Sequence, residues 1–535
     1  MTDGGNNDPT SARERIAPLG LGIDLGTSGP KVGVFAADGA LLGHGTRRVV
    51  TTRQGGGSAE QDPELIWRAV VDATAEAIAS AGGSAVAARI GVIGIDSQYS
   101  SVVPVAQDGT PTGPMITWMD SRGAVHNNAI YGREPDAFMT WLDVHGIVPL
   151  PSGADSLAHA LHLQHDRPDL HARTAAFVEP MDYLAARLTG RVTATVCSAF
   201  MFLLTDNRRL DLLAWHPELV RMAGIDPTRL PPLLPMDEPI GTLTPGVAAE
   251  LGLPANAVVY PGVNDTQVGG IATGAINPGA THAGICIGTT SVLIAGLGRK
   301  DLDIDHQLVS MPDPFGDHML MAENGNGGKA LDHVLSNMLL ADDALGHHHD
   351  PHVYDRLDTT IASSQPGANG VLFLPWLGGA MAPVDDPRMR GGFLGVSLST
   401  SRADLVRATV EGLAHNLRWL LGPAETFCRR SFDHVVFGGG GARSAAWSQI
   451  LADVLDRPVH QLADPAHANG RAAALFALAR HGVIDPASIS ARMPISARFS
   501  PDRVHRHRYG DMHEQFVASY EVTRPIAHAL RAATR

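Results

Sequence analysis

Two polar turns, each set between apolar segments, carry residues suited to holding phosphate groups. The first reads Asp24-Leu25-Gly26-Thr27-Ser28 and is followed by Lys31, and the second reads Gly288-Thr289-Thr290-Ser291. Backbone N–H groups in such turns form an anion-binding concavity, and a carboxylate at a strand end can hold Mg²⁺ through water. Either turn alone is equally explained as an ordinary hairpin turn. The two turns together predict a site that binds both ends of a triphosphate, with the turns on opposed hairpins across an interdomain cleft.

A third candidate segment is rich in glycine. Residues 438–444 read Gly-Gly-Gly-Gly-Ala-Arg-Ser, after an apolar run and before a helical pattern. Glycines allow close backbone approach to a flat group at the start of a helix, although the same residues would also suit a turn needed only for packing. The four glycines favour recognition by shape rather than by charge.

Hydrophobic patterns indicate the elements that position these turns. Residues 19–50 predict a meander of three strands, and its first turn does not open a helix, which excludes a Walker loop and a Rossmann GxGxxG motif. Helical spacing predicts helices over residues 63–81 and 404–421. The strand–turn–strand pattern recurs about 260 residues further along the chain. The sequence therefore predicts an internal duplication of two α/β domains.

Composition restricts the possible functions. The chain has 535 residues and a net charge of −14 at pH 7, which disfavours binding to nucleic acid or to anionic membranes. Three cysteines far apart in sequence exclude a disulfide scaffold, and no apolar run resembles a signal peptide or a membrane span, so a cytoplasmic location is expected. Residues 1–18 are predicted to be a disordered tail, and the His-rich residues 346–352 a solvated loop.

The order of the motifs resembles that of the FGGY carbohydrate kinases, members of the actin-like ATPase superfamily. The resemblance covers residues 20–485 and implies an α/β fold, with two ribonuclease-H-like domains flanking a catalytic cleft. The implied domains are a sugar-binding domain at 19–275, a nucleotide-binding domain at 276–510 and a helical tail at 511–535. The matching segments are GIDLGTS (22–28), TWMDSRG (117–123), DYLAARLTG (182–190), PGVNDTQVGGIATGAINPG (261–279), GTTS (288–291), LPWLGG (374–379), DDPRMRGGFLGVSLSTSRADLVRATVEGLA (385–414) and GGGGARSAAWSQILADVLDRPV (438–459).

The resemblance implies transfer of the γ-phosphoryl group of ATP to a hydroxyl of a small sugar, ketose or polyol, with ATP and Mg²⁺ as cofactors. Asp265 is the candidate general base, and capping of the following helix is its alternative role. Asp24 resembles the family's Mg²⁺-associated aspartate. The candidate phosphate and nucleotide residues are Gly26, Thr27, Ser28, Lys31, Gly288, Thr289, Thr290, Gly439, Gly440, Ala442 and Ser444.

The sugar is expected to bind at two segments of the first domain. Residues 118–122 match the family's W-x-D-x-R segment, although they could equally hold a domain interface. The segment 96–101 aligns with the place where xylulokinases typically carry Gln-Met-His-Gly, and here Tyr99-Ser100 replaces the Met-His pair. The replacement leaves the sugar open between xylulokinase-like and gluconokinase-like acceptors, with a pentulose favoured by resemblance. Besides Asp265, the candidate sugar-binding residues are Gln98, Tyr99, Ser100, Trp118, Asp120 and Arg122.

Two other functions fit parts of the sequence. An actin-like or chaperone-like ATPase would use the nucleotide without a small acceptor, and a non-catalytic sensor would bind sugar or nucleotide without transfer. The carbohydrate-type segment 118–122 argues against the first function, and the presence of both Asp24 and Asp265 argues against the second. A homodimer is considered by family analogy alone.

Overall fold

The computed structural model describes residues 17–344, 346–347 and 352–533. The predicted tail up to residue 16 and the His-rich residues 348–351 lie outside the described residues. The chain folds as two compact units. The first unit consists of Met1–Ala272, Met311–His318 and Asn469–Met493, and the second of Thr273–Ser310, Met319–Ala468 and Pro494–Arg535.

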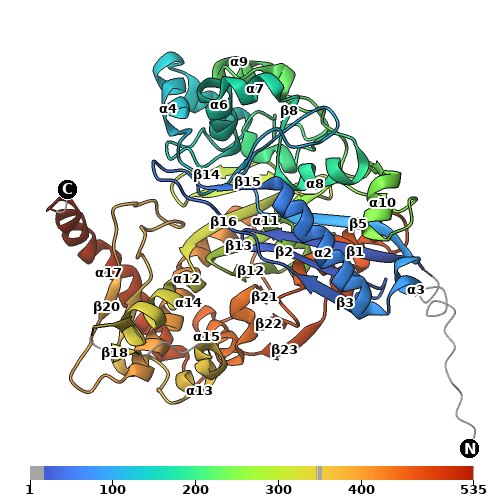
Figure 1. The fold of residues 1–535 in the computed structure, drawn as a ribbon. Coiled ribbons are helices and arrows are strands. Elements are labelled where there is room, and N and C mark those ends of the chain that lie inside the picture. The colour runs from blue at the N-terminus through green and yellow to red at the C-terminus, as the bar shows by residue number, and fades with distance from the viewer. Residues whose placement is uncertain (1–16, 345, 348–351, 534–535) are drawn as a thin grey trace, which may run out of the picture. The chain divides into compact units, whose positions relative to one another are not determined.

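A mixed β-sheet forms the centre of the first unit (Figure 1). Within the described residues it has seven strands in the order β3-β2-β1-β5-β10-β9, and β11 also pairs with β5. The strands β1, β2 and β3 are antiparallel neighbours, as predicted, whereas β5 runs parallel to β1, and β10 and β11 run parallel to β5. The strands are β1 (Leu19–Gly26), β2 (Gly29–Phe35), β3 (Leu41–Thr46), β5 (Ile90–Ser97), β9 (Gly241–Thr242), β10 (Val258–Val259) and β11 (Val263–Asn264).

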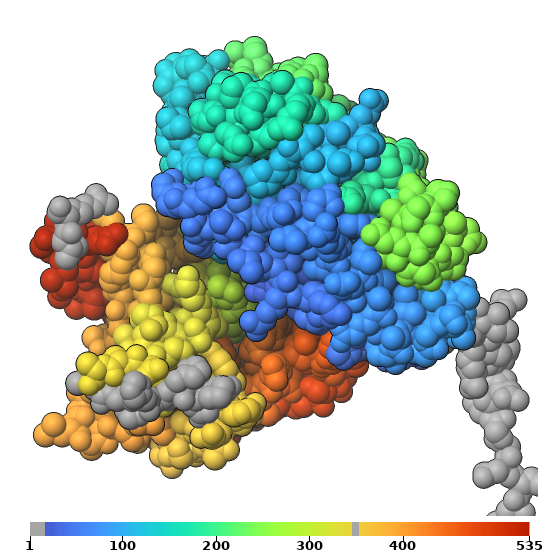
Figure 2. Space-filling model, viewed as in Figure 1, coloured from blue at the N-terminus to red at the C-terminus, as the bar shows by residue number. Residues whose placement is uncertain are grey.

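The helix α2 (Pro63–Ala81) covers one face of this sheet and confirms the helix predicted there. Asp62 caps its N-terminus, because the Asp62 carboxylate accepts backbone N–H groups of the first turn. The buried apolar face of α2 packs against β2 and β3. Nε1–H of Trp67 also donates to Glu250 at 3.3 Å. Figure 2 shows α10 (Pro245–Leu251), which carries Glu250, as a green projection beside the blue N-terminal residues.

The opposite face of the first sheet is covered by α16 (Ala468–Arg480), a helix from late in the chain. A Cβ atom added at Gly22 of β1 would lie 1.9 Å from the carbonyl oxygen of Gly470. One added at Gly94 of β5 would lie 2.1 Å from the carbonyl oxygen of Ala473. Because only glycine leaves room for this approach, the backbone of α16 rests directly on the two central strands.

Several of the remaining helices of the first unit pack against one another. Figure 1 shows α4, α6, α7 and α9 gathered together, and α4 contacts both α6 and α9. Two short strand pairs, β4 with β7 and β6 with β8, lie outside the main sheet. The bounds are β4 (Glu60–Gln61), α3 (Ser84–Ala87), β6 (Val103–Val105), β7 (Met115–Ile116), α4 (Ala124–Arg133), α5 (Ala137–Val144), α6 (Ser156–Asp166), α7 (Pro168–Arg173), β8 (Ala176–Val178), α8 (Pro180–Thr189), α9 (Pro217–Ala223) and α11 (Asp265–Thr273).

A second mixed sheet dominates the second unit. Among the described residues its order is β14-β15-β16-β13-β12-β21-β22-β23. The pairs β16–β13 and β13–β12 are antiparallel and the pairs β12–β21 and β21–β22 are parallel, which repeats the pattern from β3 to β10 in the first sheet. The predicted α/β class with two similar domains is confirmed. The strands are β12 (Ala283–Ile287), β13 (Thr290–Gly296), β14 (Leu302–Asp303), β15 (Leu308–Pro312), β16 (His318–Asn326), β21 (Val435–Gly438), β22 (Val459–Leu462) and β23 (Ile495–Phe499).

Two long helices belong to the second unit, and they pack against each other. The predicted helix at 404–421 is part of α14 (Arg402–Cys428), which begins at a capping box formed by Ser401 and Asp404. In α17 (Arg506–Ala533), Phe516 packs on Trp376 with ring centroids 5.3 Å apart. Across the described part of the chain, no helix is both long and apolar enough to cross a lipid bilayer. Shorter elements are α12 (Gly328–His333), α13 (Leu357–Ala362), α15 (Ala445–Leu455), β17 (Asp342–Asp343), β18 (Gly346–His347), β19 (Leu372–Leu374) and β20 (Gly392–Leu394).

Three histidines stack at one end of the second sheet. The ring of His434 lies 4.5 Å from that of His282 and 4.1 Å from that of His460, measured between centroids. Burial, followed by repulsion from His282 and His460, lowers the pKa of His434 from 6.5 to about 4, against a weak opposing attraction from Asp433. Between about pH 6.5 and about pH 4, His434 therefore binds a proton in the unfolded chain but not in the folded chain.

We expect the stack to make the second unit sensitive to acid. Because the folded-state pKa of His434 is depressed, its contribution to stability is complete above about pH 6.5 and is lost as the pH falls toward about 4. Urea unfolding of wild type and His434→Gln at about pH 7.5 and about pH 5 measures this contribution. The variant should lose less stability on acidification than wild type. Equal losses in the two proteins would show that His434 does not titrate in this way.

Candidate active site

Three aspartates lie at the carboxyl ends of neighbouring parallel strands in the first unit. Asp24 of β1 is paired with Asp96 of β5, and Asp96 is also paired with Val263 of β11. Asp265 follows β11 directly and is the first residue of α11. The charges of Asp24 and Asp265 both act on Asp96. The strand ends therefore gather three carboxylates at one edge of the sheet, where ligands of parallel sheets bind.

The N-terminus of α11 has its own capping residues. The side chain of Asn264 accepts the backbone N–H of Gln267 at 2.8 Å, and the Gln267 side chain accepts the backbone N–H of Asn264 at 3.1 Å. This reciprocal pair is a capping box. Capping of this helix therefore does not require the carboxylate of Asp265.

Lys31 of β2 supplies a cation beside the carboxylates. Its Nζ atom lies 2.7 Å from Oδ2 of Asp24, whose side chain is only 7% exposed, whereas that of Lys31 is 41% exposed. Burial lowers the pKa of the Lys31 amine, but attraction to Asp24 and more weakly to Asp96 outweighs burial, so the pKa lies above its ordinary value. Lys31 is thus held charged beside Asp24.

Asp96 is a buried carboxylate that the sequence interpretation missed. Burial raises its pKa, Asp24 and Asp265 raise it further, and Lys31 lowers it, so the pKa lies well above its ordinary value. The sequence does contain a signal for it. The tripeptide Gly-Ile-Asp occurs at 22–24 and again at 94–96, in two strands that pair in parallel register.

Thr27 links the first turn to the expected sugar segments. Its hydroxyl donates to Oε1 of Gln98 at 2.9 Å and accepts Nε1–H of Trp118 at 3.1 Å. Gln61 adds a second connection, because its Nε2–H group donates to the carbonyl of Thr27 at 2.7 Å. Its Oε1 accepts from Nε2 of Gln98 at 3.0 Å. The residues predicted separately for phosphate and for sugar therefore share one hydrogen-bond network.

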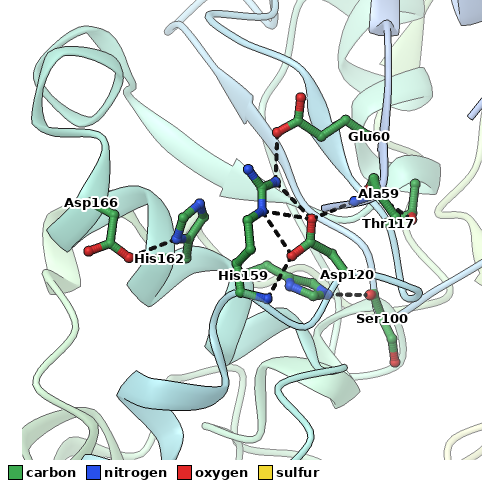
Figure 3. A network of polar contacts seen from close by, with 9 residues as sticks. Ala59, Glu60, Ser100, Thr117, Asp120, His159, His162 and Asp166 are labelled. Carbon is green, nitrogen blue, oxygen red and sulfur yellow. Dashed lines mark hydrogen bonds and ion pairs between the residues drawn. The ribbon is translucent and has the colours of Figure 1, made fainter. Parts of the chain in front are cut away.

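Asp120 lies at the centre of a network of polar contacts (Figure 3), and its carboxylate holds the guanidinium of Arg122 in place. The Asp120 carboxylate accepts the backbone N–H of Ala59 at 2.8 Å and the Arg122 guanidinium at 2.7 Å, and Arg122 also donates to Glu60 at 2.6 Å. Burial raises the pKa of Asp120, but the hydrogen bonds from Arg122 and Ala59 outweigh it, so the pKa lies below its ordinary value. Of the W-x-D-x-R side chains, Trp118 is the exposed one, at 39%.

The Tyr99-Ser100 segment has an unusual backbone. Ser100 has φ = 56°, a left-handed conformation uncommon outside glycine, and its carbonyl accepts Nε2–H of His159 at 3.1 Å. The hydroxyl of Tyr99 accepts a hydrogen bond from Thr266 at 3.4 Å. Because Thr266 follows Asp265 in the chain, the segment lies close to the third aspartate of the strand ends.

Two buried residues missed by the sequence interpretation support this segment. Burial lowers the pKa of His159 to about 4, so the imidazole is neutral and donates through Nε2. Glu179 accepts the backbone N–H of Ser101 at 3.1 Å and a hydrogen bond from Ser156, and its burial holds its pKa well above the ordinary value. No local pattern marks either residue as part of a site, because His159 is one of several histidines on α6 and Glu179 directly precedes α8.

In the second unit, Gly288 and Thr289 of the predicted Gly-Thr-Thr-Ser segment form the turn between β12 and β13, and Thr290 and Ser291 begin β13. The backbone N–H of Gly288 donates to the carbonyl of Thr290 at 3.0 Å. The N–H groups of Gly327 and Gly328 donate to the carbonyls of Thr289 and Gly288, at 3.1 and 2.8 Å. These bonds fix the turn and leave Gly288 and Thr289 exposed to solvent.

The glycine-rich segment 438–444 lies against the end of β12. Gly439 has φ = 78°, and a Cβ atom there would lie 2.6 Å from the carbonyl oxygen of Ile287. Ser444 caps α15, because its hydroxyl accepts the backbone N–H of Trp447 at 2.9 Å. The same hydroxyl donates to the carboxylate of Asp358. That carboxylate also accepts the backbone N–H of Ala445, the first residue of α15, at 3.0 Å. A carboxylate therefore already occupies the N-terminus of α15.

The predicted site residues fall into two groups, each within one unit. The turn of the first group closes at Gly26, which pairs with Gly29, and Ser28 beside it is exposed. In the second group, Gly440 and Ala442 belong to a single 3₁₀ turn, Gly440–Arg443. The first group comprises Asp24, Gly26, Thr27, Ser28, Lys31, Gln98, Tyr99, Ser100, Trp118, Asp120, Arg122 and Asp265, and the second comprises Gly288, Thr289, Thr290, Gly439, Gly440, Ala442 and Ser444.

Two family models match most of the chain. The model of the N-terminal domain of the FGGY family of carbohydrate kinases matches residues 19–272, and the model of the family's C-terminal domain matches residues 283–479. The chain belongs to the FGGY family of carbohydrate kinases. A kinase of this family uses ATP as its phosphoryl donor and a small carbohydrate as its acceptor.

Relatives of this FGGY kinase align over most of its length. A xylulose kinase of Staphylococcus epidermidis is 26% identical over 96% of this chain and 99% of the relative. A gluconokinase of Bacillus subtilis is 26% identical over 82% of this chain and 83% of the relative. The solved structure of a xylulose kinase from Rhodospirillum rubrum superposes with a TM-score of 0.81 at 24% identity, over 95% of this chain and 99% of the other. The FGGY kinase therefore has the two-domain actin-like ATPase fold expected from its motifs.

Proposed function

We propose that this kinase transfers the γ-phosphoryl group of ATP to a hydroxyl of a small ketose, with Asp265 as the general base. The position of Asp265 carries the proposal: it lies at the strand ends beside Asp24 and Asp96, on a helix that Asn264 already caps. Asp265 takes the proton of the acceptor hydroxyl while the hydroxyl oxygen bonds to the γ-phosphorus. The bond from that phosphorus to the bridging oxygen breaks, and ADP leaves.

The acceptor is placed on the first unit, beside Trp118 and Tyr99. The indole of Trp118 offers an exposed apolar face, and its N–H bond to Thr27 fixes the orientation of the ring. The Tyr99 hydroxyl is bonded to Thr266, the neighbour of Asp265. Both expected sugar segments are thereby tied to residues next to the strand-end aspartates. Asp120 and Arg122 are assigned the role of holding the Trp118 segment, because their polar groups already bind each other.

The nucleotide is placed on the second unit. Exposed Thr289 supplies a backbone N–H and a hydroxyl donor for phosphate, with Gly288 and Thr290 beside it in the turn. The backbone of Gly439, Gly440 and Ala442 is assigned to the border of adenine and ribose. A contact from the Ser444 hydroxyl would require it to leave Asp358, so we expect Ser444 to contribute mainly by positioning α15.

The strand-end residues of the first unit fit a magnesium ion bound with ATP. Mg²⁺ prefers oxygen ligands, usually through one or two carboxylates and several waters. Three carboxylates against the single ammonium of Lys31 leave a charge of −2 when all are ionised. Burial is the largest cause of the raised pKa of Asp96, and the negative charges of Asp24 and Asp265 raise it further. Asp24 is the residue that would hold the ion through water, and the ion would neutralise charge on the transferring phosphoryl group.

A ketopentose is the favoured acceptor. Support comes from the relatives, because alignment to the xylulose kinase of Staphylococcus epidermidis extends over 96% of this chain, and alignment to the Bacillus subtilis gluconokinase over 82%. Tyr99 and Ser100 stand in place of the Met-His pair typical of xylulokinases, so the pocket must meet the sugar hydroxyls with different donors. An aldonate such as gluconate is therefore the competing acceptor.

Acceptor-dependent release of ADP tests the proposal. The purified chain is assayed with Mg-ATP and a panel of ketopentoses, tetruloses, polyols and aldonates, and kcat/KM is compared across the panel. We expect the highest kcat/KM with a ketopentose. Highest kcat/KM with an aldonate would overturn the choice of substrate class. ADP release that no acceptor increases would overturn the proposed transfer reaction.

Substitution of Asp24 is expected to change the magnesium dependence of the rate. Asp24→Ala removes the carboxylate that would orient metal-bound water, so half-maximal rate should require more Mg²⁺ and the maximal rate should fall. Titrating Mg²⁺ against rate at saturating ATP measures both effects. Lys31→Met is the matched control, because it removes the 2.7 Å ion pair and keeps the carboxylate. An unchanged Mg²⁺ profile in Asp24→Ala would leave Asp24 with only a structural role in the turn.

A further inference from the structure

A cluster of two imidazoles and one carboxylate lies between α4 and α6, away from the strand-end aspartates. His126 of α4 and His162 of α6 each place a ring nitrogen 2.7 Å from the same atom, Oδ2 of Asp166. The three potential ligand atoms lie within 4.8 Å of one another. His162 and Asp166 are four residues apart on α6, a spacing that brings their side chains to one face of the helix.

The two helices that carry the cluster are fixed by buried contacts next to it. Asn127, the neighbour of His126, donates to Asp155 at 2.7 Å, and Asp155 caps α6 by accepting the backbone N–H of Ala158 at 2.8 Å. Asn127 and Asp155 are both fully buried. The ligand atoms are therefore presented from a preformed packing arrangement of α4 against α6, and binding of an ion would not have to order a flexible loop.

The donor set selects the class of ion. Two imidazole nitrogens and one carboxylate oxygen suit divalent first-row metals such as Zn²⁺, whereas Mg²⁺ prefers oxygen ligands. A further imidazole, His165, has its ring centroid 5.0 Å from that of His126 and lies at the edge of the cluster. Asp166 is nearly half exposed, with 45% of its side chain accessible, so an ion and its remaining water ligands can enter from solvent.

We propose that His126, His162 and Asp166 form a binding site for one Zn²⁺ ion or a similar divalent transition metal, distinct from the magnesium used with ATP. The ion would replace the two N–H bonds to Asp166 with three metal–ligand bonds, each imidazole then carrying its proton on the ring nitrogen that does not bind the metal, and would tie α4 to α6. Figure 3 shows the His162–Asp166 pair beside the Asp120 network. Because α6 also carries His159, which bonds to Ser100, an ion here stiffens a helix that supports the expected sugar segment.

Zinc titration of the full chain tests the site. The protein is stripped with a chelator, and zinc binding is followed by calorimetry and Co²⁺ binding by its visible spectrum. All variants are made in a background with His347, His348 and His349 changed to glutamine, because that run can bind zinc independently. We expect one tight site per chain in this background, with a spectrum indicating coordination by nitrogen and oxygen, and a rise in Tm on adding zinc.

Single substitutions assign the ligands. Asp166→Asn and His126→Gln should each weaken zinc binding by more than about 10-fold, since losing even a supporting partner of a metal ligand has this effect. The matched control is His507→Gln, which removes another histidine and aspartate pair at i, i+4, with 2.9 Å between His507 and Asp511 on α17. That pair has no third ligand of this kind among the described residues, so the control should bind zinc normally.

Two results of the zinc titrations would overturn the proposal. Absence of a tight zinc site in the background protein, or a site of unchanged affinity in both Asp166→Asn and His126→Gln, would show that Asp166 only accepts two hydrogen bonds. Circular dichroism and Tm in the absence of zinc confirm that each variant is folded. Because Asp166 is exposed and asparagine has the same shape, this variant separates ligand loss from misfolding. Kinase activity is not used as a readout, so the test is independent of the proposed acceptor.

Discussion

Asp265→Asn should lower kcat by about 10²-fold or more while leaving the Kd for ATP nearly unchanged. The amide has the shape of the carboxylate but cannot accept the proton of the acceptor hydroxyl. Because Asn264 and Gln267 cap α11, the substitution leaves the start of the helix intact. Steady-state kinetics with the preferred acceptor, together with ATP binding by calorimetry, measure the two quantities separately.

A control distinguishes this role from a general effect of losing a carboxylate. Asp38→Asn changes an exposed aspartate in the turn after β2, where its carboxylate accepts the backbone N–H of Ala40 at 2.9 Å. This variant should retain normal kcat. Near-normal turnover in Asp265→Asn, with the fold shown to be intact, would remove Asp265 from the role of general base.

Gly22→Ala should strongly destabilise the first unit. The added Cβ would lie 1.9 Å from the carbonyl oxygen of Gly470 and 2.7 Å from its carbonyl carbon, so either β1 or α16 must move. Overpacking of this kind typically costs 1–3 kcal/mol and occasionally more, and here the opposing atoms are backbone, which yields less readily than a side chain. Urea denaturation followed by far-ultraviolet circular dichroism gives the change in the free energy of unfolding.

The reciprocal substitution is an informative control. A Cβ atom at Gly470 would meet its nearest neighbour, the carbonyl oxygen of Gly22, at 3.7 Å, an ordinary contact distance. Alanine is favoured over glycine within a helix by up to about 1 kcal/mol, so Gly470→Ala should be neutral or stabilising. Equal destabilisation by both substitutions, or none by Gly22→Ala, would contradict the close approach of α16 to β1.

The hairpins and their turns were predictable from local sequence. Apolar runs on both sides of residues 24–28 and 288–291 indicate buried strands, and each polar turn between them specifies an antiparallel pair. The duplication of strand order follows from the same pattern appearing twice. The long helix α14 is predicted equally well, since its apolar spacing and its Ser401–Asp404 capping box are local features.

The site itself depended on contacts that local sequence does not encode. Asp96 lies beside Asp24 because β5 pairs in parallel with β1, and the two residues are far apart in the chain. His159 and Glu179 reach the Tyr99-Ser100 segment through tertiary packing. Ser444 shows the reverse situation: its motif indicates nucleotide contact, whereas Asp358, from a separate helix, takes up its hydroxyl.

The packing of α16 on the first sheet has a consequence for how the chain folds during synthesis. Residues 469–493 belong to the first unit, yet the ribosome releases them only after nearly all of the second unit's sheet strands have emerged. Until then, the face of β1 and β5 that includes Gly22 and Gly94 lacks its covering helix. The N-terminal unit therefore cannot be completed first, although N-terminal domains usually fold first during translation. A nascent chain stalled before residue 469 would expose this apolar face, where chaperones would be expected to bind.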